Sequence, residues 1–254
     1  MALFKDATEI LDNGNNKQVK KIEDSNGVMI WGSQTDFPYR RLEYIESTDN
    51  SAKGKYVIQL DFGFSFSNLN HLDIDYQLTN ATFNQSTGQY YGGMLSTSNL
   101  DTRIVYTANN NSKLRCYWNG TGTQADITSY AWDTNRHMVG IHKPGTLTNA
   151  RVYVDGTNRG NIGPVSPTAG TYLSLFGQKY DGSEYSILAK LYECSIYTES
   201  DSVKTYSHRL IPCQRKSDGA IGVYDTVGQV FYGNNGSGTF TAGPIVNEYW
   251  DGTL

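Results

Sequence analysis

The feature that most constrains the fold is a period of two in the apolar residues. In the segment 56–64 every second residue is apolar, and Gln59 and Asp61 lie between them. The apolar residues are Tyr56, Ile58, Leu60, Phe62 and Phe64. The segment 71–77 repeats the pattern with Leu72, Ile74 and Tyr76. An extended strand places every second side chain on one face, so both segments are predicted to be strands that bury one face.

Turn signals separate further short segments of the same kind. These segments are 103–107, 113–118, 137–142, 150–154, 172–176, 186–197, 220–224 and 229–232. The dipeptide Asp155-Gly156 predicts a tight hairpin, because both residues tolerate a positive φ. The chain also has 19 tyrosines, which favour strands, and 26 glycines, which favour turns. Many short strands joined by turns predict an all-β sandwich or jelly roll.

Two of these segments carry more specific expectations. The segment 186–197 has apolar residues on both faces, so we expect it in the middle of a sandwich. The segment 203–208 is expected to be a short turn or a single helical turn. A sandwich of roughly 200–250 residues folds as one unit, which fits a chain of 254 residues.

The first part of the chain is predicted to be a separate small module. Two β-prone runs, 18–22 and 28–31, flank Asn26-Gly27, and Asn-Gly is a strong hairpin signal. An isolated hairpin is only marginally stable in water, so this one is expected to pack against another surface. The predicted division is a hairpin module with its linker over 1–36 and a β-sandwich over 37–254.

Charge and cysteine usage exclude several classes of protein. The formal net charge of -4 does not favour a nucleic-acid binder, which needs a clustered basic surface. No apolar run is long enough to span a bilayer, and no secretory signal pattern opens the sequence. The three cysteines have no CxxC spacing, so a structural zinc site is not expected. Cys194 and Cys213 could pair, but buried free thiols are favoured.

Several motifs carry a resemblance to a known family. They are Leu42-Glu-Tyr-Ile-Glu-Ser-Thr48, then the segments 191–197, 211–219, 221–225, 231–232 and 238–243. In this order they resemble the concanavalin A-like, LamG-type domains of bacteriophage and prophage structural proteins. The hairpin 151–156 resembles the central hairpin of LamG domains. The resemblance covers roughly Tyr39 to Gly243, and it implies a concanavalin A-like jelly roll with a lectin-like, glycan-binding role.

The N-terminal segment resembles the short opening module of phage virion proteins. The resemblance lies in the segments 1–6, 19–22 and 28–31. It implies a protein of the virion, assembled in the bacterial host cytoplasm, whose first module attaches to other virion proteins. The attachment residues expected from it are Val19, Ile22, Val28, Ile30 and Trp31. Neither nucleic acid nor a membrane is expected as a partner, and display in many copies favours a homo-oligomer.

Aromatic residues beside short polar residues predict a carbohydrate site on loops. Sugars present flat C–H faces that stack on aromatic rings, while Asn, Asp and backbone groups bind their hydroxyls. The candidate residues are Tyr90, Tyr91, Trp118, Tyr130, Trp132 and Asp133. The alternative is that these are ordinary strand residues that face the core or solvent.

Candidates for metal binding and catalysis are weaker. A strand would present His71, Asp73 and Asp75 on one face, as a metal site or as the solvated face of an amphipathic strand, and the second interpretation is favoured. Glu43 and Glu46, with Asp61, would be the glycosidase candidates, but no compact Glu-x-Asp-x-x-Glu strand is present. No cofactor is indicated, although scattered calcium ligands would leave no local spacing.

These observations order three hypotheses. The first is a non-enzymatic virion protein that displays a lectin-like domain toward host-surface or mucus carbohydrate. The second is a decoration protein of the capsid or tail that binds only other virion proteins. The third is a glycoside hydrolase. The sequence has no GxSxG elbow and no cysteine-nucleophile signature, so the non-enzymatic hypotheses are favoured.

Overall fold

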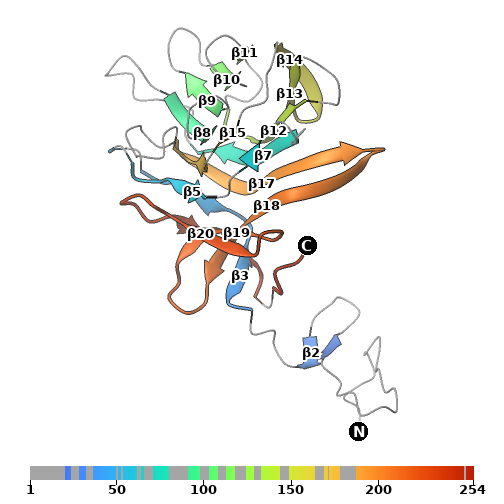
Figure 1. Ribbon diagram of the computed structural model, residues 1–254. Coiled ribbons are helices and arrows are strands. Elements are labelled where there is room, and N and C mark those ends of the chain that lie inside the picture. The colour runs from blue at the N-terminus through green and yellow to red at the C-terminus, as the bar shows by residue number, and fades with distance from the viewer. Residues whose placement is uncertain are drawn as a thin grey trace.

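The computed structural model (Figure 1) describes most of the chain after residue 36. The described residues are 21–23, 29–32, 37–49, 51–52, 54–61, 64–65, 71–79, 91–97, 103–107, 113–117, 124–128, 133–143, 149–163, 169–170, 172–177, 187–248 and 250–254. All the regular elements in these residues are strands, and every pairing between them is antiparallel. No helix that could cross a membrane occurs in them.

Two large sheets make up the sandwich. The smaller, six-stranded sheet has the order β11 (Gln124–Thr128), β10 (Lys113–Tyr117), β9 (Arg103–Thr107), β8 (Tyr91–Thr97), β16 (Leu173–Leu175) and β5 (Ile58–Leu60). The main path of the larger, twelve-stranded sheet is β14 (Thr157–Ile162), β13 (Ala150–Val154), β12 (Arg136–His142), β7 (His71–Leu78), β17 (Ala189–Ser200), β18 (Val203–Arg215), β19 (Ile221–Asp225) and β20 (Val230–Gly233).

Short strands complete the sheets. Four of them join the large sheet beside its main path, namely β3 (Tyr39–Leu42), β4 (Ile45–Glu46), β21 (Thr241–Ala242) and β22 (Ile245–Asn247). The strand β3 pairs with β18 and β22, and β4 pairs with β17 and β21. A separate two-stranded sheet joins β6 (Phe64–Ser65) to β15 (Ala169–Gly170).

The chain winds between the two sheets as a jelly roll. It places β5 in the six-stranded sheet, β7 in the large sheet, β8 to β11 in the first again and β12 to β14 in the second. Then β16 and β17 return to the first and second sheets. The edges of the two sheets meet, since β11 contacts β14 and β5 contacts β20. The predicted all-β jelly-roll sandwich is thus confirmed.

The core lies between the facing sides of the two sheets. The alternation predicted for the segment 71–77 is confirmed, because Leu72, Ile74 and Tyr76 are all fully buried in this core. The strand β17 contributes Leu191, Cys194 and Ile196, also fully buried. It lies between β7 and β18 in the large sheet.

Two hairpins show where turn signals succeed and fail. The predicted turn at Asp155-Gly156 joins β13 to β14, with φ values of 51° and 74°. The prediction of a turn in the segment 203–208 is wrong, because these residues begin the long strand β18. The preceding turn is Asp201-Ser202, with φ values of 50° and 65°. Without glycine or asparagine this turn has a weak signal, since serine rarely adopts a positive φ. The β17–β18 hairpin extends beyond the rest of its sheet (Figure 1).

The predicted N-terminal hairpin is confirmed as a pairing of two strands. The strands β1 (Lys21–Glu23) and β2 (Met29–Gly32) form an antiparallel sheet of their own. Val19 and Val28 lie outside the described residues, and only the backbone is described for Ile22, Ile30 and Trp31. The attachment role of these five residues and the division at residue 36 stay predictions.

A second hydrophobic cluster lies apart from the main core. It is formed by Ile211, Cys213, Tyr224 and Trp250, with Phe37, Tyr39 and Phe231 packed against them. The ring of Phe37 meets the rings of Tyr224 and Trp250 edge-on, at centroid distances of 5.1 and 5.4 Å. We call it the terminal aromatic cluster, because it joins the start of the sandwich to residues near its end. All three cysteines are buried and free, as favoured above.

We predict that Trp250→Ala lowers the free energy of unfolding by about 3–5 kcal/mol, the usual cost of deleting a buried aromatic side chain. Trp250 is only 1% exposed. The control is Leu254→Ala, four residues further on, where the side chain is 50% exposed and the expected change is within about 0.5 kcal/mol. Urea denaturation measures both, and equal stability of the two variants would contradict a structural role for the cluster.

Candidate functional site

The outer face of the large sheet carries a dense group of interacting polar side chains. Because Leu72, Ile74 and Tyr76 of β7 point into the core, His71, Asp73 and Asp75 point to the outer face. The expectation that these three form a solvated face is wrong for His71 and Asp73, which are only 9% and 7% exposed. Neighbouring side chains from β12, β17 and β18 cover them.

Asp73 is the centre of a buried hydrogen-bond network. The Nε2 atom of His142 lies 2.6 Å from Oδ1 of Asp73, and the hydroxyl of Tyr197 donates to Oδ2 over 2.6 Å. The ammonium group of Lys204 lies 3.8 Å from Oδ2. Burial alone would raise the pKa of Asp73, but the hydrogen bonds from His142 and Tyr197 outweigh it and lower the pKa. Asp73 is therefore an ionised carboxylate held by three partners.

Aromatic rings pack around this network. The ring of His71 stacks on Tyr197 at 4.9 Å and lies 4.4 Å from the ring of His142, which in turn stacks on Tyr153 at 4.6 Å. The buried Nδ1 atom of His71 has no hydrogen-bond partner among the described residues. Burial, reinforced by the neighbouring His142, lowers the pKa of His71. We call this group the His71–Asp73 cluster.

Gly140 makes the network sterically feasible. It lies on β12 directly opposite Asp73 of β7. A Cβ atom on Gly140 would overlap both Oδ1 of Asp73 and Nε2 of His142. The hydrogen bond between these two side chains therefore passes over a position that only glycine leaves open. In the described part of the chain, no three His, Cys, Asp or Glu side chains converge to hold a metal ion.

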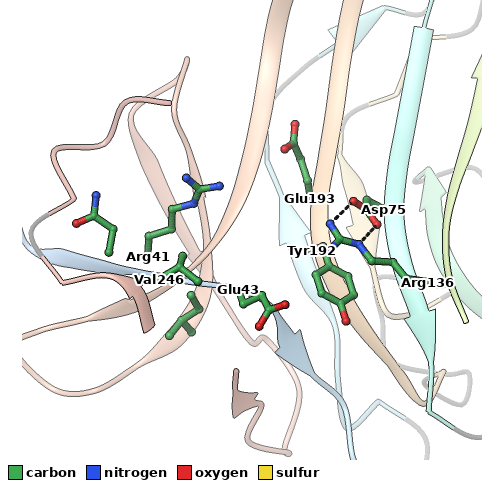
Figure 2. Close-up of a pocket in the computed structure, with 9 residues that line it drawn as sticks. Arg41, Glu43, Asp75, Arg136, Tyr192, Glu193 and Val246 are labelled. Carbon is green, nitrogen blue, oxygen red and sulfur yellow. Dashed lines mark hydrogen bonds and ion pairs between the residues drawn. The ribbon is translucent and has the colours of Figure 1, made fainter. Parts of the chain in front are cut away.

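A polar pocket with a volume of about 350 Å³ lies on the same outer face (Figure 2). Its walls come from β7, β12 and β17 on one side and from β3, β22 and the residue after β3 on the other. The lining residues are Arg41, Leu42, Glu43, Asp75, Arg136, Tyr192, Glu193, Val246 and Asn247. We call it the outer-face pocket.

Arg136 organises one wall of this pocket. Its Nε and Nη2 atoms donate to the two carboxylate oxygens of Asp75 over 2.8 and 2.7 Å. Its guanidinium also lies 3.8 Å from the ring centroid of Tyr192, a cation–π contact. The hydroxyl of Tyr192 donates to Oε1 of Gln77 over 2.8 Å. These contacts fix the orientation of the charged and aromatic groups before any ligand arrives.

A second paired carboxylate lies beside Tyr192. The guanidinium of Arg209 donates to the two carboxylate oxygens of Glu193 over 2.7 and 3.3 Å. The ring of Tyr44 meets the ring of Tyr192 edge-on at 5.5 Å. Two of the three carboxylates that line the pocket are therefore held by guanidinium groups, and Glu43 is the third.

A β-bulge explains why sequence periodicity missed this pocket. The register of β17 against β7 shifts between Leu191 and Glu193, so Tyr192 is the extra residue. As a result the consecutive residues Tyr192 and Glu193 both line the pocket. Strict alternation would place them on opposite faces. Of the earlier glycosidase candidates, only Glu43 lines the pocket, while Asp61 follows β5 in the other sheet.

The sugar-binding residues predicted from sequence are mostly not placed by the structure. Tyr90, Trp118, Tyr130 and Trp132 lie outside the described residues. The loop position predicted for Tyr91 is wrong, because Tyr91 begins strand β8; only its backbone is described. Their contacts to sugar stay predictions.

Asp133 is the exception, since its side chain is described. It accepts a hydrogen bond from the backbone N–H of Asn135 over 2.7 Å and lies 2.8 Å from Nε2 of His137. The other ring nitrogen of His137 lies 2.8 Å from a carboxylate oxygen of Asp155. Burial alone would lower the pKa of His137, but the two carboxylates outweigh it and raise the pKa. A sugar-binding role for Asp133 stays a prediction.

Comparison with known proteins gives a distant likeness to β-sandwich structures. No family model matches the sequence, and no curated protein matches it. The heptameric SAP-like pentraxin of Limulus polyphemus has 12% identity and a TM-score of 0.46, with 63% of this chain and 77% of the pentraxin covered. Domains LG4-5 of the mouse laminin alpha1 chain have 9% identity and a TM-score of 0.36, with 92% and 85% covered.

The Crh5 transglycosylase in complex with NAG has 11% identity and a TM-score of 0.31, with 67% of this chain and 96% of the transglycosylase covered. Such values carry no argument about ligand or activity. The chemistry of this chain must therefore be inferred from its own side chains.

We predict that Gly140→Ala lowers the free energy of unfolding by about 1–3 kcal/mol, because the added methyl group must displace Asp73 or His142. The control is Met138→Ala on the same face of β12, where the side chain is 45% exposed and a change within about 0.5 kcal/mol is expected. The test is a double-mutant cycle with Asp73→Ala by urea denaturation. If the changes in the free energy of unfolding of the two single variants simply add up in the double variant, Gly140 is not coupled to the Asp73 network.

We also predict opposite pH dependences for two histidines. The raised pKa of His137 gives stabilisation that is complete below pH 6.5 and is lost as pH rises through the folded-state pKa. The lowered pKa of His71 gives the reverse, with stability lost as pH falls from 6.5 through the folded-state pKa.

The measurement is the stability difference between wild type and His137→Gln, and between wild type and His71→Gln, across pH 5 to 8. The first difference should shrink as pH rises, and the second should grow. If both stability differences change in the same direction with pH, the opposite pKa shifts assigned to His137 and His71 are contradicted.

Proposed function

We propose that this chain is a non-enzymatic carbohydrate-binding protein and that the outer-face pocket contacts the sugar. The observation that carries the proposal is the prearranged wall of the pocket. There, Arg136 is fixed by Asp75 and stacks on Tyr192. Saccharides need closely spaced donors and acceptors together with some ring surface, and a polar, solvent-accessible pocket with a tyrosine offers both.

The charge arrangement of the pocket supports binding rather than hydrolysis. Glycoside hydrolysis needs one carboxyl group that keeps a proton and a second that acts as base or nucleophile. Asp75 and Glu193 each accept two hydrogen bonds from a guanidinium group, so neither carboxylate could act on a substrate without giving up an ion pair. Glu43 is the only lining carboxylate without such a partner in the described residues. Glu43 is thus one unpaired carboxylate, whereas the hydrolytic mechanism needs two.

The proposed context is a bacteriophage or prophage particle. Support comes from the sequence resemblance of the sandwich and of the opening module, and from the hairpin β1–β2, which forms a sheet of its own. In this proposal the hairpin attaches the protein to other virion proteins, and the sandwich is displayed toward host-surface or mucus glycans. Display of many copies raises the avidity of weak single sites by orders of magnitude.

A decoration protein that binds only other virion proteins is the second candidate. The hairpin favours it, because a two-stranded sheet is marginal on its own and needs a surface to pack against. Mass spectrometry of purified particles tests the context that both candidates share. Absence of this chain from particles would overturn both virion proposals and leave the carbohydrate proposal to be judged on its own.

We predict that the protein binds one or more members of a glycan array and that Tyr192→Ala weakens this binding about tenfold or more, as the loss of one central aromatic contact implies. The control is Tyr153→Ala, a half-buried tyrosine on the same outer face that does not line the pocket. It should bind as the wild type does.

Three further outcomes discriminate the alternatives. Loss of binding in Trp118→Ala or Trp132→Ala, with Tyr192→Ala unaffected, would move the site to the aromatic residues predicted from sequence. Binding to no glycan would overturn the carbohydrate proposal. Release of reducing sugar, abolished by Glu43→Gln, would establish a glycoside hydrolase instead.

A further inference from the structure

We propose that the ligand of the outer-face pocket is a saccharide that carries a carboxylate, of the uronic or sialic acid class, and that Arg41 pairs with that carboxylate. This proposal rests on the carbohydrate-binding function proposed above. It adds the chemical class of the sugar and the residue that selects it.

Some of the charged side chains around the pocket form ion pairs with each other, and two do not. Asp75 is paired with Arg136, and Glu193 is paired with Arg209, which lies next to the pocket. Arg41 and Glu43 also line the pocket, but neither side chain makes a hydrogen bond or an ion pair with any described residue. Among the described residues the pocket therefore presents one guanidinium and one carboxylate outside any hydrogen bond or ion pair, although Glu43 still interacts with Arg136 at longer range.

The contrast with the preceding residue shows that the position of Arg41 is informative. Arg40 points to the opposite side of β3, where its Nε donates to Glu248 over 2.6 Å and its Nη1 to Gln214 over 3.4 Å. One of two consecutive arginines is thus held by protein groups, and the other lines the pocket with no hydrogen-bond or ion-pair partner in the part of the chain that the structure describes. Figure 2 shows Arg41 on the wall opposite Arg136 and Tyr192, with no interaction drawn to its guanidinium.

The geometry of a guanidinium favours a carboxylate as its partner. Arginine presents parallel N–H donors in a planar fork that matches the two oxygens of a carboxylate. Arg136 already uses its Nε and Nη2 donors on Asp75, so Arg41 is the lining arginine whose donors are not used by any described residue. An incoming carboxylate would complete the same two-point pairing that the pocket already shows at Asp75 and Glu193.

The net charge of the site permits an anionic ligand. The lining itself holds two arginines (Arg41 and Arg136) and three carboxylates (Glu43, Asp75 and Glu193), and Arg209, which is paired with Glu193 outside the lining, brings the formal charge of the group to zero. Glu43 is then left to accept hydrogen bonds from sugar hydroxyl or amide groups. Because it also repels an anion, it keeps the affinity moderate, as suits a site that gains strength from many copies.

The experiment compares three ligands by calorimetry with the full-length chain. They are a uronic acid oligosaccharide, the same oligosaccharide with its carboxyl groups reduced to alcohols, and an oligosaccharide of equal length that has no carboxyl groups but carries sulfate groups. The wild type should bind the carboxylated ligand about tenfold more tightly than the other two, the size of effect expected for one charge-assisted pair. A sialylated oligosaccharide and its carboxyl-reduced form provide the same comparison for the second class.

The variants test the role of Arg41. Arg41→Ala and Arg41→Gln should erase the preference for the carboxylate, so that the carboxylated and the reduced oligosaccharide bind with equal affinity. The matched control Arg40→Ala should keep the preference, because Arg40 lies outside the pocket. Glu43→Gln should strengthen binding of the carboxylated ligand about two- to fivefold through loss of repulsion. Thermal unfolding confirms that each variant is folded, and the two Arg41 substitutions guard against loss of a single variant.

The failures of the two proposals are distinguishable. Equal binding of carboxylated and reduced ligands by the wild type, or a preference that survives both Arg41 substitutions, would overturn the role of Arg41. In that case glycan binding that depends on Tyr192 would still uphold the carbohydrate function. A preference for the sulfated ligand would also overturn the carboxylate assignment. Binding of no glycan at all would remove the function on which this inference rests.

Discussion

The central strand β7 must satisfy two unlike environments at once, and the rest of the structure follows from how it does so. One face enters the hydrophobic core through Leu72, Ile74 and Tyr76. The other face buries the charge of Asp73, which is tolerated only because His142, Tyr197 and Lys204 surround it. These partners come from β12, β17 and β18, so the order of strands in the large sheet and the polar network on it depend on each other.

The outer face therefore has two neighbouring polar regions with different properties. In the His71–Asp73 cluster the rings stack closely and the charge is enclosed. In the outer-face pocket the ion pairs are open to solvent on one side, and Arg41 and Glu43 have no protein partner among the described residues. The two regions share β7, since Asp73 belongs to the cluster and Asp75 to the pocket. The buried His71–Asp73 cluster therefore supports the adjacent wall of the outer-face pocket and keeps it rigid.

The sequence predicted those features that depend on local periodicity and on strong turn residues. The alternation in the segment 71–77, the hairpin at Asp155-Gly156 and the N-terminal β1–β2 pairing belong to this class. The sequence did not predict features that depend on pairing between distant parts of the chain. The β17–β18 turn uses Asp201 and Ser202 at positive φ, and the bulge at Tyr192 reverses the expected facing of Glu193. The burial of Asp73 was also unpredictable, because its partners lie between 69 and 131 residues away in the chain.

The terminal aromatic cluster has a mechanical consequence. Phe37 precedes β3, and its ring is packed against Trp250 and Tyr224, so both ends of the sandwich are fastened at one place. Tension applied at Phe37 would pass first into this cluster and then along β3, whose hydrogen bonds to β18 and β22 lie roughly across the pull. Arg41 lies on that same strand. Force applied on the N-terminal side of Phe37 would therefore act on the wall of the outer-face pocket before it reached the central strands β7 and β17. A ligand bound across the pocket would resist part of that force.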